Sequence, residues 1–210
     1  MEYGLPVERW RRAKHNIAVA RRKTETMKST RQKLASFGSL ALLVAVFGLA
    51  PDTKAAEGPT DSQIVGIVLA ADEIDIEYGR MALAKSQDKA VRDFAQRMVT
   101  DHSAVQKSVI GLAEKLGINA EDSPTSDGLK KTAAEITVKL KALKGKEFDK
   151  FYIDNEVNYH KTVTDAVQAV LIPSAQNPEL KSALEGAQPL FLKHLEHARM
   201  VQSGGSTMAH

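Results

Sequence analysis

Three histidines and two carboxylates of this sequence occupy positions that helical periodicity assigns to an apolar face. His102 and His194 each lie inside an apolar stripe when residues are placed about 100° apart around a helix. Asp75 shares the apolar face of an earlier helix, and Glu156 lies in the stripe of another, with His160 at its flank. Buried charges are costly unless they are paired or bound to a metal ion. These five residues are therefore where chemistry is most expected.

The five residues also fall at similar heights along their helices. Asp75 lies about 11 residues before the first expected turn, and His102 lies about 16 residues after it. His160 lies about 15 residues before a later turn, and His194 about 19 residues after it. Whichever way the two helix pairs associate, these side chains should meet near the middle of the core.

Imidazoles and carboxylates together form a suitable ligand set for iron, zinc, manganese or copper. One prediction is therefore a site for one transition-metal ion, with ligands from Asp75, His102, Glu156, His160 and His194. The other is a hydrogen-bonded network of the same residues that fixes the register of the helices. We favour that second interpretation, because a core histidine is usually structural. The protein would then be a non-enzymatic structural, interaction or stress-related domain.

Signals for other chemistry are missing from the sequence. It has no Gly-rich phosphate loop, no serine elbow and no cysteine, so we assign no catalytic residue. An enzyme acting on a small molecule in the core is a third interpretation, without a defined substrate. Residues 1–55 hold 11 of the 29 Lys and Arg but only 4 of the 26 Asp and Glu, so the remainder is mildly acidic. We therefore expect no nucleic-acid partner, and the sequence identifies no partner protein.

Periodicity and breakers predict four long helices and one short helix. The long helices cover about 61–85, 88–116, 146–172 and 177–202, with Pro173 closing the third and a kink at Pro189 in the fourth. Residues 119–128 are expected to form a loop, followed by a short helix over about 128–143. The short connections imply two antiparallel hairpins, and the long middle connection can cross the length of the bundle. The expected fold is all-α, a ferritin-like four-helix bundle with a helix in its crossover.

The N-terminal region has the features of a secretory signal. Basic residues precede an apolar run at 37–50, and small residues before Ala56 suit cleavage between Ala55 and Ala56. The run is shorter than the roughly 20 residues of a membrane-spanning helix, although an uncleaved anchor is the alternative. We expect residues 27–55 to be the signal and residues 1–26 to be an extension outside the native product, which would start at Met27. Residues 56–202 would then form the bundle, without a transmembrane span, and residues 203–210 a disordered tail.

Several segments of the chain resemble a known family, the domain of unknown function 4142. The similar segments are IEYGRMAL at 76–83, FAQRMVTDH at 94–102, Phe148-Asp149 with Tyr152 and His160, and His194-Leu195 with Ala198. The family consists of exported bacterial proteins with a ferritin-like fold, labelled as periplasmic or outer-membrane proteins. The resemblance implies the fold and an exported, periplasmic or outer-membrane-associated location, but no activity.

The histidine spacing departs from that of di-iron ferritin-like proteins. Those proteins carry Glu-x-x-His on two helices. Here Glu156 and His160 are four residues apart, and the pair His194 and His197 lacks the glutamate. A single-metal site is therefore the better form of the metal hypothesis.

Overall fold

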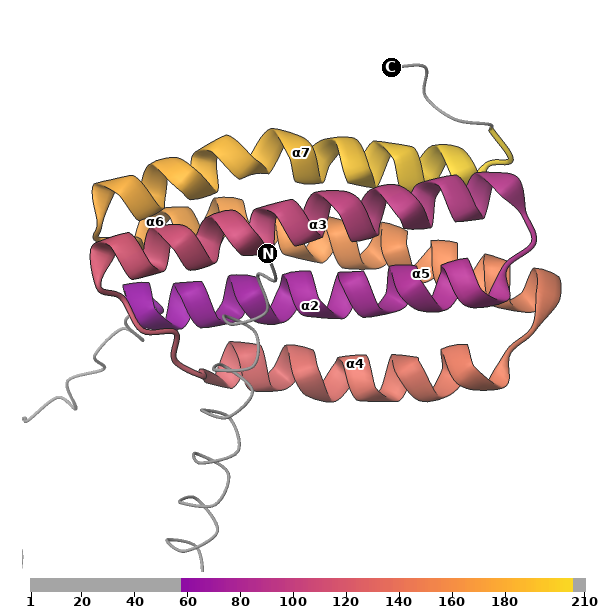
Figure 1. Cartoon of the computed structure of the whole chain (residues 1–210), viewed down its shortest axis with the longest axis horizontal. Helices are drawn as coiled ribbons and strands as arrows, with labels where there is room; N and C mark the ends of the chain where they lie inside the picture. The colour runs from indigo at the N-terminus through magenta and orange to yellow at the C-terminus, as the bar shows by residue number, and fades with distance from the viewer. Residues whose placement is uncertain (1–57, 206–210) are drawn as a thin grey trace, which may run out of the picture. The chain divides into compact units, whose positions relative to one another are not determined.

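The computed structural model describes residues 58–205, which are helical apart from short links and contain no strand (Figure 1). The expectations for residues 1–57 and for the end of the tail lie outside the described residues. The helices, in chain order, are α2 Asp61–Lys85, α3 Lys89–Leu116, α4 Pro124–Ala142, α5 Gly145–Ala166, the π-helix η1 Val167–Leu171, α6 Ile172–Ser174 and α7 Pro178–Gln202.

Local capping sets the ends of these helices. The Thr60 side chain accepts a hydrogen bond from the Gln63 N–H, and the Gln63 side chain accepts one from the Thr60 N–H. This reciprocal pair satisfies two of the free backbone donors at the start of α2. Asp88 and Asn177 cap α3 and α7, and a side-chain oxygen of each accepts hydrogen bonds from two backbone N–H groups of the first turn. Gly117 ends α3 with φ 67°, a left-handed conformation that glycine adopts without a steric penalty.

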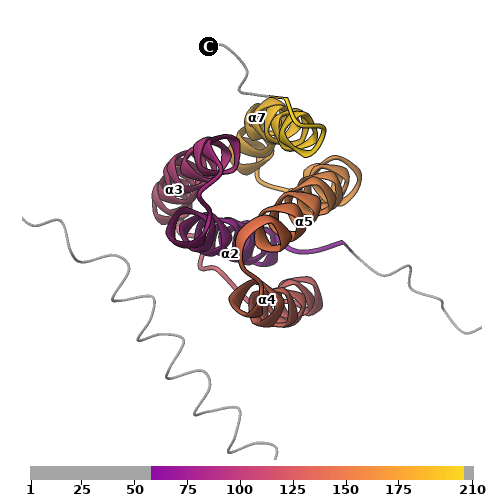
Figure 2. The same cartoon turned by 90° about the vertical axis from the view of Figure 1, so that its right-hand side faces the viewer.

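Four long helices form the bundle, and α4 lies outside it. Seen end-on, α2, α3, α5 and α7 occupy the corners, with α2 and α7 each packed against both α3 and α5 (Figure 2). The chain direction in Figure 1 makes each of these four neighbouring pairs antiparallel. The crossover helix α4 runs along α2, and there the Tyr78 hydroxyl donates to the Ala133 carbonyl at 3.3 Å. The prediction of a ferritin-like four-helix bundle with a helical crossover is confirmed.

The core is apolar towards both ends and polar in the middle. One apolar cluster gathers around Ile64, Leu171 and Leu180, and a second gathers around Phe94 and Tyr152. The buried polar residues between them are Asp72, Asp75, His102, Glu156, His160 and His194, which we call the polar layer. The helical fold therefore brings ionisable groups from all four long helices to one level.

Two local expectations were wrong. Residues 124–128 are helical instead of looped, because Ser123 forms a capping box with Ser126 and Pro124 suits the first turn of α4. Pro173 does not close the third long helix either, since the chain continues through η1 into α6. Pro173 lies in α6 directly before its last residue, Ser174, so the helix ends one residue after the proline. Among residues 58–205, no helix combines the length and the hydropathy that a membrane crossing requires.

Candidate metal centre

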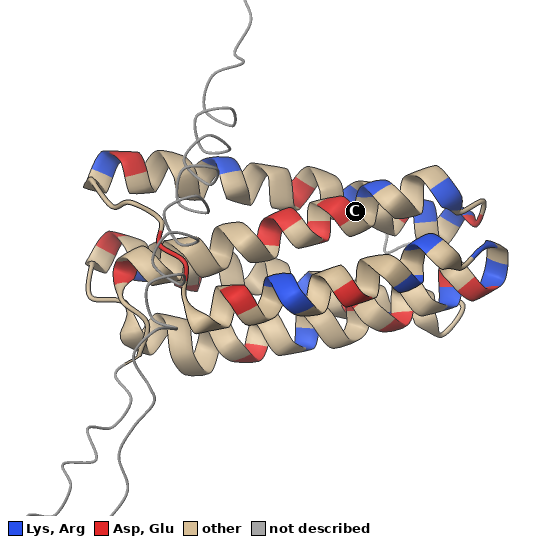
Figure 3. Ribbon diagram, turned by 90° about the horizontal axis from the view of Figure 1, so that it is seen from below, with Lys and Arg blue, Asp and Glu red and all other residues tan. Residues whose placement is uncertain are grey.

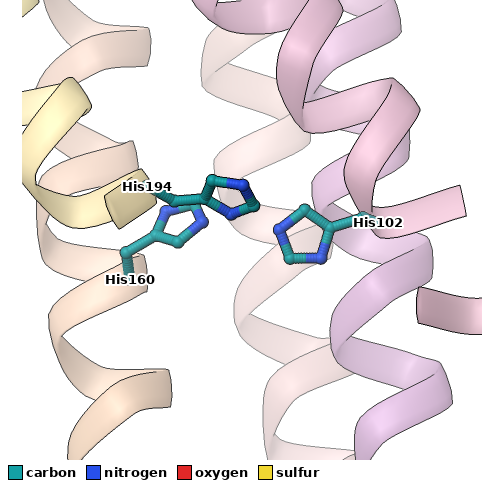
Figure 4. A group of neighbouring side chains, drawn as sticks. All are labelled: His102, His160 and His194. Atoms are coloured by element: carbon teal, nitrogen blue, oxygen red, sulfur yellow. The ribbon is translucent and has the colours of Figure 1, made fainter. Parts of the chain in front are cut away.

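The structure brings all five predicted site residues together in the polar layer. Asp75 comes from α2, His102 from α3, Glu156 and His160 from α5, and His194 from α7. Each of them is at most 3% exposed. Figure 4 shows the three imidazoles converging on one point from three different helices. Residues spread over about 120 positions of the sequence thus share one site because helix length and register match.

His102 lies between two aspartates that are one helical turn apart on α2. Its Nδ1 is 2.7 Å from Asp72 Oδ1, and its Nε2 is 2.9 Å from Asp75 Oδ2. The same Asp75 Oδ2 is 3.2 Å from Nε2 of His160. One carboxylate oxygen therefore contacts two imidazoles that belong to different helices.

The donor atoms are close enough for one cation to reach several of them. His102, His160 and His194 each offer a ring nitrogen, and these three atoms lie within 4.8 Å of one another. Asp75, Glu156 and His160 form a second group that meets the same limit. The two groups share His160, so the polar layer offers both an all-imidazole face and a carboxylate-rich face.

Many polar atoms of this layer have no hydrogen-bond partner. Both side-chain oxygens of Asp75 and of Glu156 are in this condition, as are Nδ1 of His194 and Nε2 of both His102 and His160. The contact between His102 and Asp75 is short, but it is not aligned as a hydrogen bond. A buried polar atom without a partner costs about 1–3 kcal/mol, so this concentration of them needs an explanation. Coordination of a cation is one explanation, because a cation would bind the unpartnered oxygens and nitrogens at the same time.

The protonation states of the layer follow from burial and from the mutual charges. Burial alone would lower the pKa of His102, but Asp75 and Asp72 raise this pKa to about 10. Burial would raise the pKa of Asp75, yet the charges of His102 and His160 hold it well below its usual range. Burial and the neighbouring Asp75 raise the pKa of Glu156. Near neutral pH, His102 is therefore cationic and Asp75 is anionic, and Glu156 takes up a proton more readily than an exposed glutamate does.

His194 is held as a neutral imidazole and is oriented by a carboxylate. Burial and the nearby charge of His102 lower the pKa of His194 to about 4. Its Nε2 lies 2.9 Å from Oδ2 of Asp101, whose side chain is 28% exposed. A carboxylate bonded to one ring nitrogen fixes the tautomer and leaves the other nitrogen as a free ligand. Here that free nitrogen is Nδ1, which is buried and has no partner.

Two residues of the site escaped the sequence-based prediction. Asp72 was not included because a single apolar stripe was assumed for α2, whereas this helix is covered by α3, α4 and α5. Its position one turn before Asp75 was the available signal. Asp101 was missed because it directly precedes His102 and points to a different neighbouring helix.

His197 is buried like the other histidines but belongs to neither group. It is 4% exposed, and its ring is packed against Phe94 with centroids 5.2 Å apart. Both of its ring nitrogens lack a hydrogen-bond partner. His197 lies three residues after His194 in the sequence, and the structure leaves it outside the two groups of potential ligands.

The family of this chain is decided by a match over most of its length. The model of a domain of unknown function, DUF4142, matches residues 48–201. The chain belongs to this family. The resemblance found in the sequence is thereby confirmed, and no curated protein matches the chain.

Two solved structures share the fold of this DUF4142 protein at low sequence identity. A DUF305 protein from Streptomyces coelicolor, described as secreted, has a TM-score of 0.56 at 12% identity, covering 70% of this chain and 96% of its own. CopM in its Cu(II)-bound form has a TM-score of 0.54 at 11% identity, covering 70% of this chain and 98% of its own. At these identities the likeness establishes a common helical fold.

Proposed function

We propose that this DUF4142 protein binds one transition-metal ion in its polar layer. His102, His160 and His194 would supply imidazole nitrogens, and Asp75 with Glu156 would supply carboxylate oxygens. The observation that supports this most strongly is the convergence of three buried imidazoles within 4.8 Å of one another. The unpartnered oxygens of Asp75 and Glu156 give independent support, because a cation would satisfy them.

The ligand chemistry favours copper or zinc over harder ions. Imidazole-rich sites suit zinc, copper, iron and nickel, and affinity for divalent ions is highest at copper. CopM, which shares the fold, is described in a Cu(II)-bound form, so copper is the first ion to test. We propose further that the protein is exported, since the sequence before Ala56 has the features of a cleavable signal and the similar DUF305 protein is described as secreted.

A structural role for the same residues is the second candidate. It is favoured by the contacts that His102 makes with Asp72 and Asp75, both at 2.9 Å or less. Such a network would fix the register of α3 against α2 without any ion. In that case the protein would be a non-enzymatic structural or interaction domain.

Metal analysis of untagged protein separates these two candidates. The protein is stripped with a chelator, incubated separately with Cu²⁺, Zn²⁺, Fe²⁺ and Mn²⁺, desalted and analysed for bound metal. We expect about one equivalent of copper or zinc per chain, and its loss in His160→Ala and His194→Ala.

The matched control is His197→Ala, which removes a buried histidine of the same helix as His194 but outside the ligand groups. It should retain the full equivalent. Less than about a tenth of an equivalent of every ion in the wild-type protein would exclude the metal function and leave the structural one.

A further inference from the structure

A cavity of about 190 Å³ lies directly beside the histidine cluster. Asp72, His102 and His160 form part of its lining, so the cavity reaches the polar layer. Its rim includes Thr125 of α4 and Thr162 of α5, which are exposed, so the cavity is reached from between these two helices. An apolar cavity of about 150 Å³ can stay dry and bind benzene. The volume here therefore suits one aromatic ring with a small substituent.

The π-helix η1 faces this cavity. Three of its five residues, Val167, Val170 and Leu171, belong to the lining. Val167 and Leu171 are buried, whereas Val170 is 44% exposed. Single π-helical turns occur frequently at functional sites, where they redirect side chains relative to a regular α-helix. The irregular turn is thus located where α5 borders the cavity.

The lining excludes charged ligands by its chemistry. Among the described residues that form it there is no Lys or Arg, and apolar side chains dominate its walls. Asp72 is the carboxylate of the lining, and it is paired at 2.7 Å with the cationic His102, which also belongs to the lining. Because these two charges already compensate each other, an anion or a bulky cation would lose its hydration against aliphatic walls without gaining an unpaired partner.

Aromatic rings at the inner end of the cavity provide a surface for another ring. Phe191 stacks on His102, with ring centroids 5.7 Å apart and an interplanar angle of 7°. Tyr159 meets His160 edge to face, with centroids 5.9 Å apart. Offset-stacked and edge-to-face contacts of this kind stabilise aromatic pairs beyond simple burial.

We propose that this cavity is a binding site for a small uncharged aromatic molecule, held among Val167, Leu171 and Phe191 with one edge towards the histidine cluster. The inference goes beyond the metal site and does not depend on it. The same walls would accept the molecule whether or not an ion is bound.

Titration of the full chain with toluene, followed by amide chemical shifts, tests this site in metal-free protein. We expect saturable shifts centred on Val167, Leu171 and Phe191, and contacts from the toluene methyl group to the Val167 and Leu171 methyl groups. Benzoate has a similar size but carries a charge, so it should bind at least about tenfold more weakly.

A pair of alanines supplies matched variants. Ala166 belongs to the lining, whereas Ala169, in the neighbouring turn, is exposed and lies outside it. Ala166→Phe should fill the cavity and weaken toluene binding at least about tenfold, and Ala169→Phe should leave it unchanged.

Three results would overturn the proposal. The first is the absence of saturable shifts up to the solubility limit of toluene. The second is benzoate binding as tightly as toluene. The third is an equal loss of toluene affinity in the Ala166→Phe and Ala169→Phe variants.

Discussion

Each imidazole of the polar layer contacts a different set of carboxylates, so the three histidines are not equivalent as ligands. His102 contacts two buried aspartates, His160 contacts Asp75 and Glu156, and His194 contacts the partly exposed Asp101. A carboxylate bonded to the second nitrogen of a ligating histidine orients the ring and raises its basicity. The strength of metal binding should therefore depend on residues that never touch the ion.

Asp101 offers the cleanest test of this dependence. Asp101→Asn keeps the shape of the side chain but removes the charge that orients His194, and its partial exposure should leave folding intact. We expect metal affinity to fall about 10-fold to 100-fold while the stoichiometry stays at one ion. Calorimetric titration measures both quantities. An unchanged affinity would show that Asp101 has no part in presenting His194.

Metal binding should release a proton from His102. In the metal-free protein the pKa of His102 is raised to about 10, so both ring nitrogens are protonated at pH 7. An ion can use this ring only after displacing a proton, and a higher pH therefore favours the ion. Affinity should rise about tenfold per pH unit between pH 6.5 and 8.5. Calorimetry in two buffers with different ionisation enthalpies counts the released protons, and a pH-independent affinity would contradict this role of His102.

At the level of single residues, periodicity alone found the five predicted site residues. Each of them lies within an apolar stripe or at its flank, and a polar residue at such a position is detectable without any structure. Asp72 and Asp101 were not found because their roles depend on which helix lies opposite, and a single sequence does not contain that information. The metal-ligand role of the five residues stays a prediction until the analysis of bound metal is made.

The helices themselves were predictable where punctuation residues are strong. Thr60, Asp88, Gly117 and Asn177 all mark helix ends through defined capping geometry. The π-helix η1 was not predictable, because its sequence has the same apolar spacing as the α-helix around it. Pro189 lies inside α7 and does not end this helix, which continues to Gln202.

Close backbone packing at Gly66 fixes how the crossover begins. A Cβ atom at this position would lie 2.0 Å from the carbonyl oxygen of Glu121, whose N–H donates to the Ser62 carbonyl at 3.0 Å. The link between α3 and α4 therefore passes directly against α2. Because backbone atoms cannot move aside as a flexible side chain can, only glycine fits here without displacing the link.

Gly66→Ala should therefore destabilise the fold. We expect a loss of about 1–3 kcal/mol in the free energy of unfolding, measured by urea denaturation. Gly111 is also helical but has nothing within 4 Å of its would-be Cβ, so Gly111→Ala should gain about 0.5–1 kcal/mol. Equal effects of the two substitutions would show that α2 and the link are not in close contact.

On the scale of the whole bundle, the charged residues divide into an outer set and the buried polar layer. Figure 3 shows bands of acidic and basic residues along the lengths of the helices. Several outer pairs, such as Lys89 with Asp93 and Lys161 with Asp165, lie one turn apart on the same helix. Exposed pairs of this kind contribute little to stability. The electrostatic energy that distinguishes this fold is therefore concentrated in its interior, where all four long helices meet.

An ion bound in that interior would join the four helices and so contribute to folding. At a free metal concentration about 1,000 times the dissociation constant, binding should raise the free energy of unfolding by about 4 kcal/mol. The two leucine variants should respond differently in metal-free protein. His102→Leu leaves Asp72 buried without its partner and removes one of the two imidazoles at Asp75, so it should cost about 3–5 kcal/mol. His194→Leu affects only the partly exposed Asp101 and should be neutral or stabilising.

His194→Leu is therefore the informative variant for the whole molecule. Its metal-free stability should match or exceed that of the wild type, while the metal-dependent gain should vanish. Urea denaturation with and without the bound ion measures both. A purely structural polar layer would instead give the same stability for wild type with and without metal, because such a network contains no ion. The size of the metal-dependent difference between wild type and His194→Leu thus measures directly how much of the stability of the four-helix bundle comes from the ion.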